Sequence, residues 1–335
     1  MDPQTYGYII YGLTLLTMGG IYAVLVLGLN IQWGYTGHFN AGVAGFVAVG
    51  AYTQALLTTP VSENHIGGIG VPIPVAMALA MVFSAAIAWG TAKVCIRLRA
   101  DYLAIATIGI AEILRLIFKN ELWATNGPRG VSQIPKAFDG LPQPWDMIAF
   151  LGMVLGIVAV IYLLLQRAQA SPWGRVMSAI RDNEEAASAV GKDVEAFRME
   201  SFVLGAALMG LGGALLAQYL RQIGPNVSDP LTATFLVWVM LIAGGSGNNR
   251  GALLGAFLLW AVWSMTQIVS SYLPNEAVVF GWEIDNLQIR SAYFRVFLIG
   301  LILQFILQLR PQGILPERRP APDPAHRGPQ KGERA

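Results

Sequence analysis

The chain has 335 residues, of which 55% are hydrophobic and 13% charged, and its mean hydropathy is +0.53. Soluble domains carry about 25% charged residues, so this sequence has too few ionised side chains to cover the surface of soluble domains of the same length. The net charge of +2 argues against a nucleic-acid partner, and one cysteine with three widely separated histidines argues against a disulfide or a metal site.

Nine apolar stretches are candidates for membrane-spanning helices, which need roughly 20 mostly apolar residues. They are residues 8–29, 40–58, 72–92, 102–118, 147–165, 199–220, 232–246, 251–272 and 291–309. The second and seventh stretches are short and rich in glycine, which allows a broken or re-entrant segment at either one, provided that its free backbone groups are buried in protein. The sequence therefore predicts an all-α polytopic membrane protein with about nine transmembrane helices, within a range of eight to ten.

The distribution of Lys and Arg predicts the orientation, because the cytoplasmic connections of membrane proteins carry an excess of basic residues. Basic residues gather in the connections at 93–101 and 166–198 and after residue 310, whereas the connections at 59–71 and 222–231 contain none. With nine spans, every basic connection lies on one side of the membrane. We therefore expect a periplasmic N-terminus and a cytoplasmic C-terminus.

Residues 1–315 are expected to form the transmembrane domain, and residues 316–335 differ from it in composition. This last segment is rich in proline and charge and has almost no apolar residues, which predicts a disordered cytoplasmic tail. Contact between its basic residues and anionic membrane lipid is the alternative interpretation.

The longest basic connection, 166–198, contains the signals of two short helices. Ser171 followed by Pro172 is typical of a helix start, with a capping hydroxyl and then proline at the first helical position. Asp182 or Asn183 can cap a second helix, whose alanines would let the backbone of a partner come close. This part of the connection is expected to form a compact cytosolic helix between two membrane spans.

The second of these helices contains Glu185-Ala186-Ala187 followed by Gly191, and this pattern resembles the EAA loop of bacterial ABC importer permeases. In that family the loop forms a coupling helix that sits in a cleft of the ATPase subunit. The resemblance implies that these four residues couple the chain to an ATPase, with Arg181 as a charge contact. The alternative is an ordinary amphipathic loop helix, because alanine and glutamate are common helix formers.

A second resemblance covers about residues 20–315 and keeps its order throughout. The motifs that carry it include Gly28-Leu29-Asn30, Trp33-Gly34-Tyr35-Thr36-Gly37, Arg99-Ala100-Asp101-Tyr102-Leu103 and Gly244-Gly245-Ser246-Gly247. They resemble the branched-chain amino acid permeases of the LivM type. Related urea permeases share the Trp-Gly-Tyr-Thr-Gly element, so a permease for another amino acid, an amide or urea stays open.

This resemblance implies a subunit of an ATP-driven importer for leucine, isoleucine and valine in the bacterial inner membrane. Its partners would be a second homologous permease, two cytosolic ATP-binding subunits and a periplasmic amino-acid-binding protein. The sequence has no GxxxxGK[ST] motif to hold the phosphates of ATP. We therefore expect ATP and Mg²⁺ on the partner ATPases, and a chain that binds no cofactor and is not itself an enzyme.

The glycine- and asparagine-rich stretch 28–52 is the expected solute path. A broken span there would expose backbone groups that can meet the charged ends of an amino acid, and an amide in lipid needs a hydrogen-bond partner. We therefore predict Asn30, Trp33 and Asn40 as pathway residues. The glycines alone fit tight helix packing equally well.

Glu112 is a fourth pathway candidate, and it lies three residues before Arg115 on one face of the fourth predicted span. An isolated charge at mid-membrane costs about 2.5–3.5 kcal/mol on insertion scales. The two residues therefore predict either a polar contact along the solute path or a buried structural pair. Glu112 would also be the ion-binding group in an alternative of a different class, a stand-alone ion-coupled secondary transporter.

Overall fold

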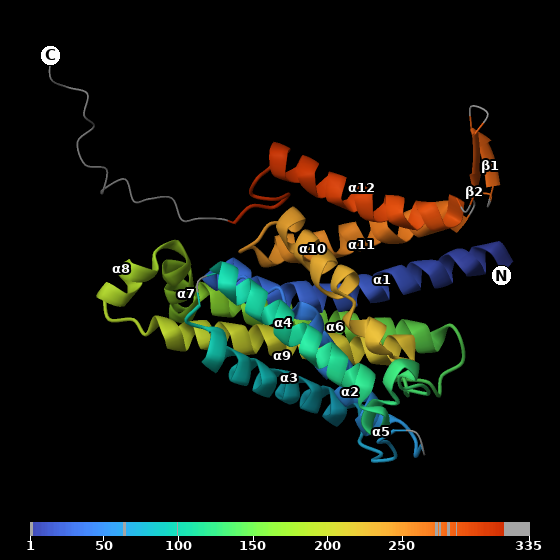
Figure 1. Cartoon of the computed structure of the whole chain (residues 1–335), viewed down its shortest axis with the longest axis horizontal. Coiled ribbons are helices and arrows are strands. Elements are labelled where there is room, and N and C mark those ends of the chain that lie inside the picture. Colours follow the sequence, from blue (N-terminus) through green and yellow to red (C-terminus); the bar gives the residue numbers. More distant parts are fainter. Residues whose placement is uncertain are drawn as a thin grey trace.

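The computed structural model describes residues 3–62, 65–98, 100–271, 274, 276–279, 282–285 and 287–317. Long helices lie side by side along the long axis of the molecule (Figure 1). The helices of more than ten residues are α1 (Pro3–Leu29), α2 (Val43–Thr58), α3 (Ile73–Cys95), α4 (Ala100–Asn120), α6 (Trp145–Ala170), α7 (Pro172–Asp182), α9 (Val194–Leu220), α11 (Asn249–Ser271) and α12 (Leu287–Leu309). The shorter ones are η1 (Asn30–Tyr35), α5 (Leu122–Thr125), η2 (Gly127–Arg129), α8 (Glu184–Ala189), η3 (Pro225–Ser228), η4 (Leu231–Phe235) and α10 (Leu236–Gly244).

Each of the nine predicted apolar stretches falls on a helix, and six helices in the described part of the chain are long and apolar enough to cross a membrane. These six are Thr5–Tyr35, Ile73–Cys95, Trp145–Ala170, Val194–Leu220, Asn249–Ser270 and Ile289–Leu309. The count by length and composition is thus lower than the predicted nine. The helices that make up the difference are α2 and η4–α10, which are shorter, and α4, which carries two acidic and two basic residues.

A two-stranded antiparallel hairpin, β1 (Glu276–Val279) and β2 (Trp282–Asp285), separates α11 from α12. The sequence-based assignment to an all-α class does not include it. The hairpin lies beyond the ends of these two helices, at the same end of the molecule as the start of α1 (Figure 1). The class assignment therefore holds for the helical bundle, and the hairpin is a small addition outside it.

Helix α9 lies at the centre of the bundle and packs against α1, α2 and α3. Glycines allow the closest crossings: a Cβ added to Gly50 of α2 would lie 2.0 Å from the carbonyl oxygen of Gly210 in α9. A Cβ added to Gly213 would lie 2.1 Å from the carbonyl oxygen of Val47. Such contacts are possible only where a helix presents no side chain. The packing interpretation of the glycine-rich stretch is therefore confirmed at Gly50.

The helical structure is interrupted near the two short apolar stretches, as their glycine content allows. In the first break, α1 ends in the π-helical η1, residues 37–42 leave the helix, and α2 then begins. In the second break, the π-helical η4 leads into the nine-residue α10, and a turn at 245–248 leads into α11. Gly245 and Gly247 in this turn have φ angles of +120° and +80°, which favour glycine.

After α12, residues 310–317 return to the bundle beside the second break. The N–H groups of Ile314 and Leu315 donate hydrogen bonds of 2.9 and 3.0 Å to the carbonyls of Ala243 and Gly244. Helices α7 and α8 lie at this end of the molecule, opposite the start of α1 (Figure 1). Residues 318–335, most of the predicted disordered tail, lie outside the described residues.

Candidate coupling site and solute path

Helices α7 and α8 form where the capping signals predict them. Helix α7 begins at Pro172, directly after Ser171 in an extended conformation. The predicted cap by the Ser171 hydroxyl is wrong, because this hydroxyl donates to the carbonyl of Ala168 at 2.6 Å. Asn183 caps α8, because its side chain accepts a hydrogen bond of 2.9 Å from the N–H of Ala186. The chain then turns at Gly191, whose φ of +79° favours glycine. The positions of the two helices are confirmed, and their role in coupling stays a prediction.

Helix α8 lies at one end of the molecule (Figure 1), and four of its six residues are alanine or serine. Of the predicted coupling residues, Glu185, Ala186 and Gly191 are exposed, and Val190 beside them is 74% exposed. Ala187 differs, because it is buried and packs toward the bundle. A soluble partner would therefore meet Glu185, Ala186 and the turn at Gly191, while Ala187 fixes the inner face of the helix.

Two arginines attach the predicted coupling helices to the rest of the bundle. Arg198 of α9 donates a hydrogen bond of 2.7 Å to Glu184 of α8. Arg181 of α7 donates from Nη2 to Oε2 of Glu317 at 2.8 Å and from Nη1 to the carbonyl of Gly34 in η1. The structure thus places Arg181 toward the bundle, where it joins the first break to the C-terminal segment, and not on the exposed face of the loop.

Asn30 joins the two breaks. Its Nδ2 donates to Oδ1 of Asn249 at 2.9 Å, and its Oδ1 accepts from the N–H of Gly247 at 2.8 Å. The hydroxyl of Tyr35 also donates to Oδ1 of Asn249, at 2.7 Å. Asn30 and Asn249 are fully buried, so the amide in the apolar bundle has the partners that it needs, and these partners belong to the protein.

Asn40 stabilises the non-helical segment 37–42 in the same way. Its Nδ2 donates to Gln32 at 2.8 Å, and its Oδ1 accepts from the N–H of Gly42 at 2.8 Å. Its backbone carbonyl accepts a hydrogen bond of 2.9 Å from the indole of Trp238. Trp33 lies against the same indole, with 5.3 Å between ring centroids. These predicted pathway residues therefore gather around the breaks, and Asn30 and Asn40 are both fully buried.

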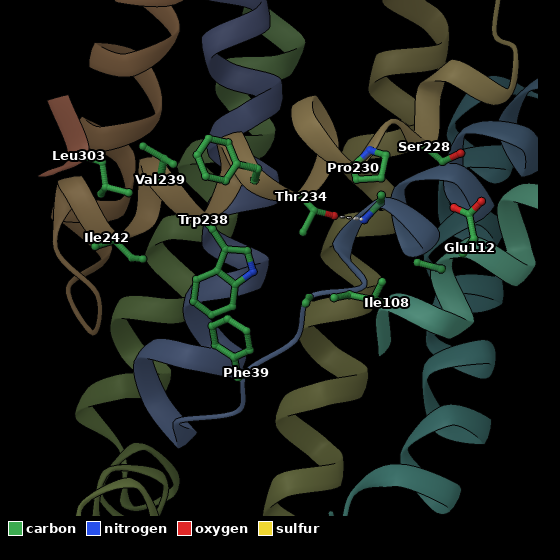
Figure 2. A pocket seen from close by; sticks show the side chains of 14 residues that line it. Phe39, Ile108, Glu112, Ser228, Pro230, Thr234, Trp238, Val239, Ile242 and Leu303 are labelled. Atoms are coloured by element: carbon green, nitrogen blue, oxygen red, sulfur yellow. Dashed lines mark hydrogen bonds between the residues drawn. The ribbon is translucent and has the colours of Figure 1, made fainter. Parts of the chain in front are cut away.

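A cavity of about 450 Å³ opens between the start of α2, α4, η4–α10 and α12 (Figure 2). Most of its lining is apolar. Trp238 and Phe39 lie one against the other on one side, with 4.5 Å between ring centroids, and Glu112 contributes a carboxylate from α4 on another side (Figure 2). Of the four predicted pathway residues, only Glu112 lines this cavity.

Glu112 and Arg115 form an ion pair with two hydrogen bonds. Arg115 donates from Nε and Nη2 to the two carboxylate oxygens of Glu112, at 2.8 and 2.6 Å. The side chains are 41% and 32% exposed, so the pair is not buried within this chain. Arg115 also lines a second cavity of about 470 Å³, together with the basic residues Lys119 and Arg129.

The sequence-based search missed Trp238 and Phe39 as site residues. Trp238 lies in the uninterrupted apolar run of α10, where the pattern does not distinguish a residue that lines a cavity from one in the core. The indole N–H is a weak signal, because a buried tryptophan usually needs an acceptor. In this fold the acceptor is a carbonyl freed by the break, nearly 200 residues away in the sequence.

The chain is similar to known transport proteins over nearly its whole length. The model of the family "Branched-chain amino acid transport system / permease component" matches residues 11–307. The high-affinity branched-chain amino acid transport system permease protein LivM of Salmonella typhimurium is 32% identical, over 91% of this chain and 70% of the relative. A probable branched-chain amino acid transport permease protein LivM of Methanocaldococcus jannaschii is 28% identical, over 89% of this chain and 91% of the relative.

More distant similarity extends to the permease protein LivH of a high-affinity branched-chain amino acid transport system in Salmonella typhimurium. It is 24% identical, over 78% of this chain and 85% of the relative. No solved structure matches the chain. The family match includes both breaks, the cavity and the exposed helix α8. This protein, with several helices apolar enough to span a membrane, belongs to the family of branched-chain amino acid transport system permease components.

Proposed function

We propose that this chain is the permease subunit of an ATP-driven importer for leucine, isoleucine and valine, and that it forms part of the translocation path. The observation that carries the proposal is the family match over residues 11–307, which includes both breaks, the cavity and helix α8. The names of several relatives also describe high-affinity branched-chain amino acid transport.

The proposed importer contains a second homologous permease, two cytosolic subunits that bind ATP and Mg²⁺, and a periplasmic amino-acid-binding protein. Helices α4 and α12 support a partner within the membrane, because apolar side chains such as Ile105, Phe297 and Phe305 are exposed on them. An apolar surface beside the cavity suits a second permease or the surrounding lipid.

In this proposal all nine apolar stretches cross the bacterial inner membrane, with the N-terminus in the periplasm and α7, α8 and the C-terminus in the cytoplasm. At 1.5 Å per residue, the 16 residues of α2 extend about 24 Å, which is less than the roughly 30 Å of a bilayer core. Residues 37–42 complete the crossing as non-helical chain, which is tolerated at membrane depth because protein surrounds it.

The proposed coupling route runs from α8 through α7 to both breaks. An ATPase that moves the exposed face of α8 would also move Arg181, because α7 and α8 follow each other directly. Arg181 transmits this displacement to Gly34 in the first break and to Glu317 in the C-terminal segment. That segment is hydrogen-bonded to the end of α10, so both breaks respond to the same movement.

The test is reconstitution of the purified complex in proteoliposomes with its binding protein, followed by measurement of radiolabelled leucine uptake. We expect uptake that requires both ATP inside the vesicles and the binding protein outside. Uptake driven by a proton or sodium gradient, without an ATPase subunit, would overturn the proposal in favour of a secondary transporter. ATP-dependent uptake of urea or an amide, without leucine uptake, would overturn the assignment of the solute.

A further inference from the structure

The Glu112–Arg115 ion pair lies between two cavities of contrasting chemistry. Glu112 lines the cavity of about 450 Å³, whose other lining residues are mostly apolar (Figure 2). Arg115 lines the cavity of about 470 Å³, where Lys119 and Arg129 add positive charge. Because the pair occupies one turn of α4, an acidic group faces one cavity and basic groups face the other.

We propose that this pair opens to bind the charged head of an aliphatic amino acid. The ammonium group binds Glu112, the carboxylate binds Arg115, and the branched side chain occupies the apolar cavity. This inference rests on the proposed function and adds a solute site to it. The exchange is electrostatically balanced, because each charge of the separated pair gains an opposite charge of the zwitterion.

The position of the pair supports this role. Two-fifths of the Glu112 side chain and a third of the Arg115 side chain are exposed, so a solute can reach both. The cavity volume is in the range of about 300–1,000 Å³ that is typical of small-molecule sites. The remaining lining has few polar groups, which suits a side chain that carries only carbon and hydrogen.

The walls of the apolar cavity connect it to the two breaks. The hydroxyl of Thr234 in η4 accepts a hydrogen bond of 3.0 Å from the N–H of Ala44 at the start of α2 (Figure 2). Trp238 donates to the carbonyl of Asn40 at 2.9 Å. A relative displacement of the breaks would therefore change the shape of the cavity and release the solute.

The first experiment exchanges the two charges. The double variant Glu112→Arg with Arg115→Glu keeps an ion pair at the same spacing, in the order that a helix favours less, and it reverses the charge facing each cavity. We expect normal assembly and initial leucine uptake lowered at least about tenfold, the effect of losing one good charge contact. Each single variant, Glu112→Gln and Arg115→Gln, should raise the KM for leucine. If the exchanged pair transports leucine normally, the pair is only structural and the inference is wrong.

The second experiment changes the size of the apolar cavity and applies even if the exchanged pair fails to assemble. Ile108 lines the cavity, whereas Ile113 on the same helix does not, and their exposed fractions are similar at 54% and 57%. In Ile108→Phe we expect uptake of leucine to fall relative to valine by roughly tenfold, which is the usual effect of one methylene in an apolar pocket. Ile113→Phe is the matched control and should leave the ratio unchanged.

These outcomes separate the two proposals. If the wild-type importer takes up no branched-chain amino acid, the proposed function fails. If wild-type uptake is normal and Ile108→Phe leaves the leucine-to-valine ratio as in Ile113→Phe, the solute site is wrong while the proposed function stands.

Discussion

Arg181 is the residue whose replacement should separate ATP hydrolysis from transport. Besides a bond of 3.5 Å to the adjacent Asp182, Arg181→Ala removes two donors to other segments of the chain, one to Glu317 at 2.8 Å and one to the carbonyl of Gly34. Hydrogen bonds to charged groups contribute about 1.5–3 kcal/mol each. The side chains of Arg181 and Glu317 are 17% and 20% exposed, so water replaces the lost bonds only in part.

Taking the lower value for each bond, because some water reaches both side chains, gives a loss of about 3 kcal/mol. This loss corresponds to a roughly hundredfold change in the equilibrium constant for the attachment of α7 and α8 to the bundle. We expect Arg181→Ala to keep basal ATP hydrolysis and to lower leucine uptake at least tenfold, an effect within that hundredfold. The measurement is the number of ATP molecules hydrolysed per leucine taken up by proteoliposomes.

Arg175→Ala is the matched control for this experiment. Arg175 lies in the same helix and is exposed, with one hydrogen bond of 3.3 Å to the carbonyl of Ala170. Exposed substitutions of this kind usually change stability by less than about 0.5 kcal/mol. If Arg181→Ala hydrolyses ATP and imports leucine in the same ratio as Arg175→Ala, the proposed route through Arg181 is refuted.

Three further predictions concern the helices and their turns. Gly50→Ala should lower the thermal unfolding midpoint in detergent, at a cost of about 1–3 kcal/mol, because its Cβ would lie 2.0 Å from the carbonyl oxygen of Gly210. The control Gly90→Ala, whose Cβ would have no atom within 4 Å, should raise the midpoint slightly. Asn183→Ala should destabilise α8 by about 1 kcal/mol through loss of its cap, seen as faster amide hydrogen exchange, whereas Asn183→Asp should keep protection. Gly191→Val should lower ATP-coupled uptake, because a φ of +79° is strained for a branched residue. Gly191→Asn should be tolerated, and equal uptake by the two variants would contradict the prediction.

The sequence predicts the local features of the fold well. All nine apolar stretches fall on helices, because the hydrophobic length of a span is a property of the stretch alone. The start of α7 and the cap of α8 are predicted for the same reason, since Pro172 and Asn183 act on neighbouring backbone groups. The hairpin β1–β2 is not predicted, because the sequence analysis considers only apolar stretches long enough for helices, and each strand has four residues.

The candidate site is predicted less completely, because its contacts are long-range. Asn30 is recognisable as an amide in an apolar stretch, but its partner Asn249 lies 219 residues away. Arg181 lies in the charged connection 166–198, which the sequence predicts to be exposed. Only the folded chain brings Gly34 and Glu317 within hydrogen-bonding distance of Arg181. A periodic pattern describes one helix at a time, so it cannot identify a side chain that joins three segments.

The first break gives a physical reason why a movement of α7 and α8 can affect the cavity. In a continuous α-helix the carbonyl of Gly34 would accept from the N–H of His38. In this fold His38 donates to Gln32 at 2.8 Å, so the Gly34 carbonyl is free to bind Arg181. Six residues later, in the non-helical segment that follows η1, the carbonyl of Asn40 accepts a hydrogen bond from Trp238 in the cavity wall. One short segment thus offers one acceptor to α7 and another to the wall of the cavity, and a regular helix would offer neither.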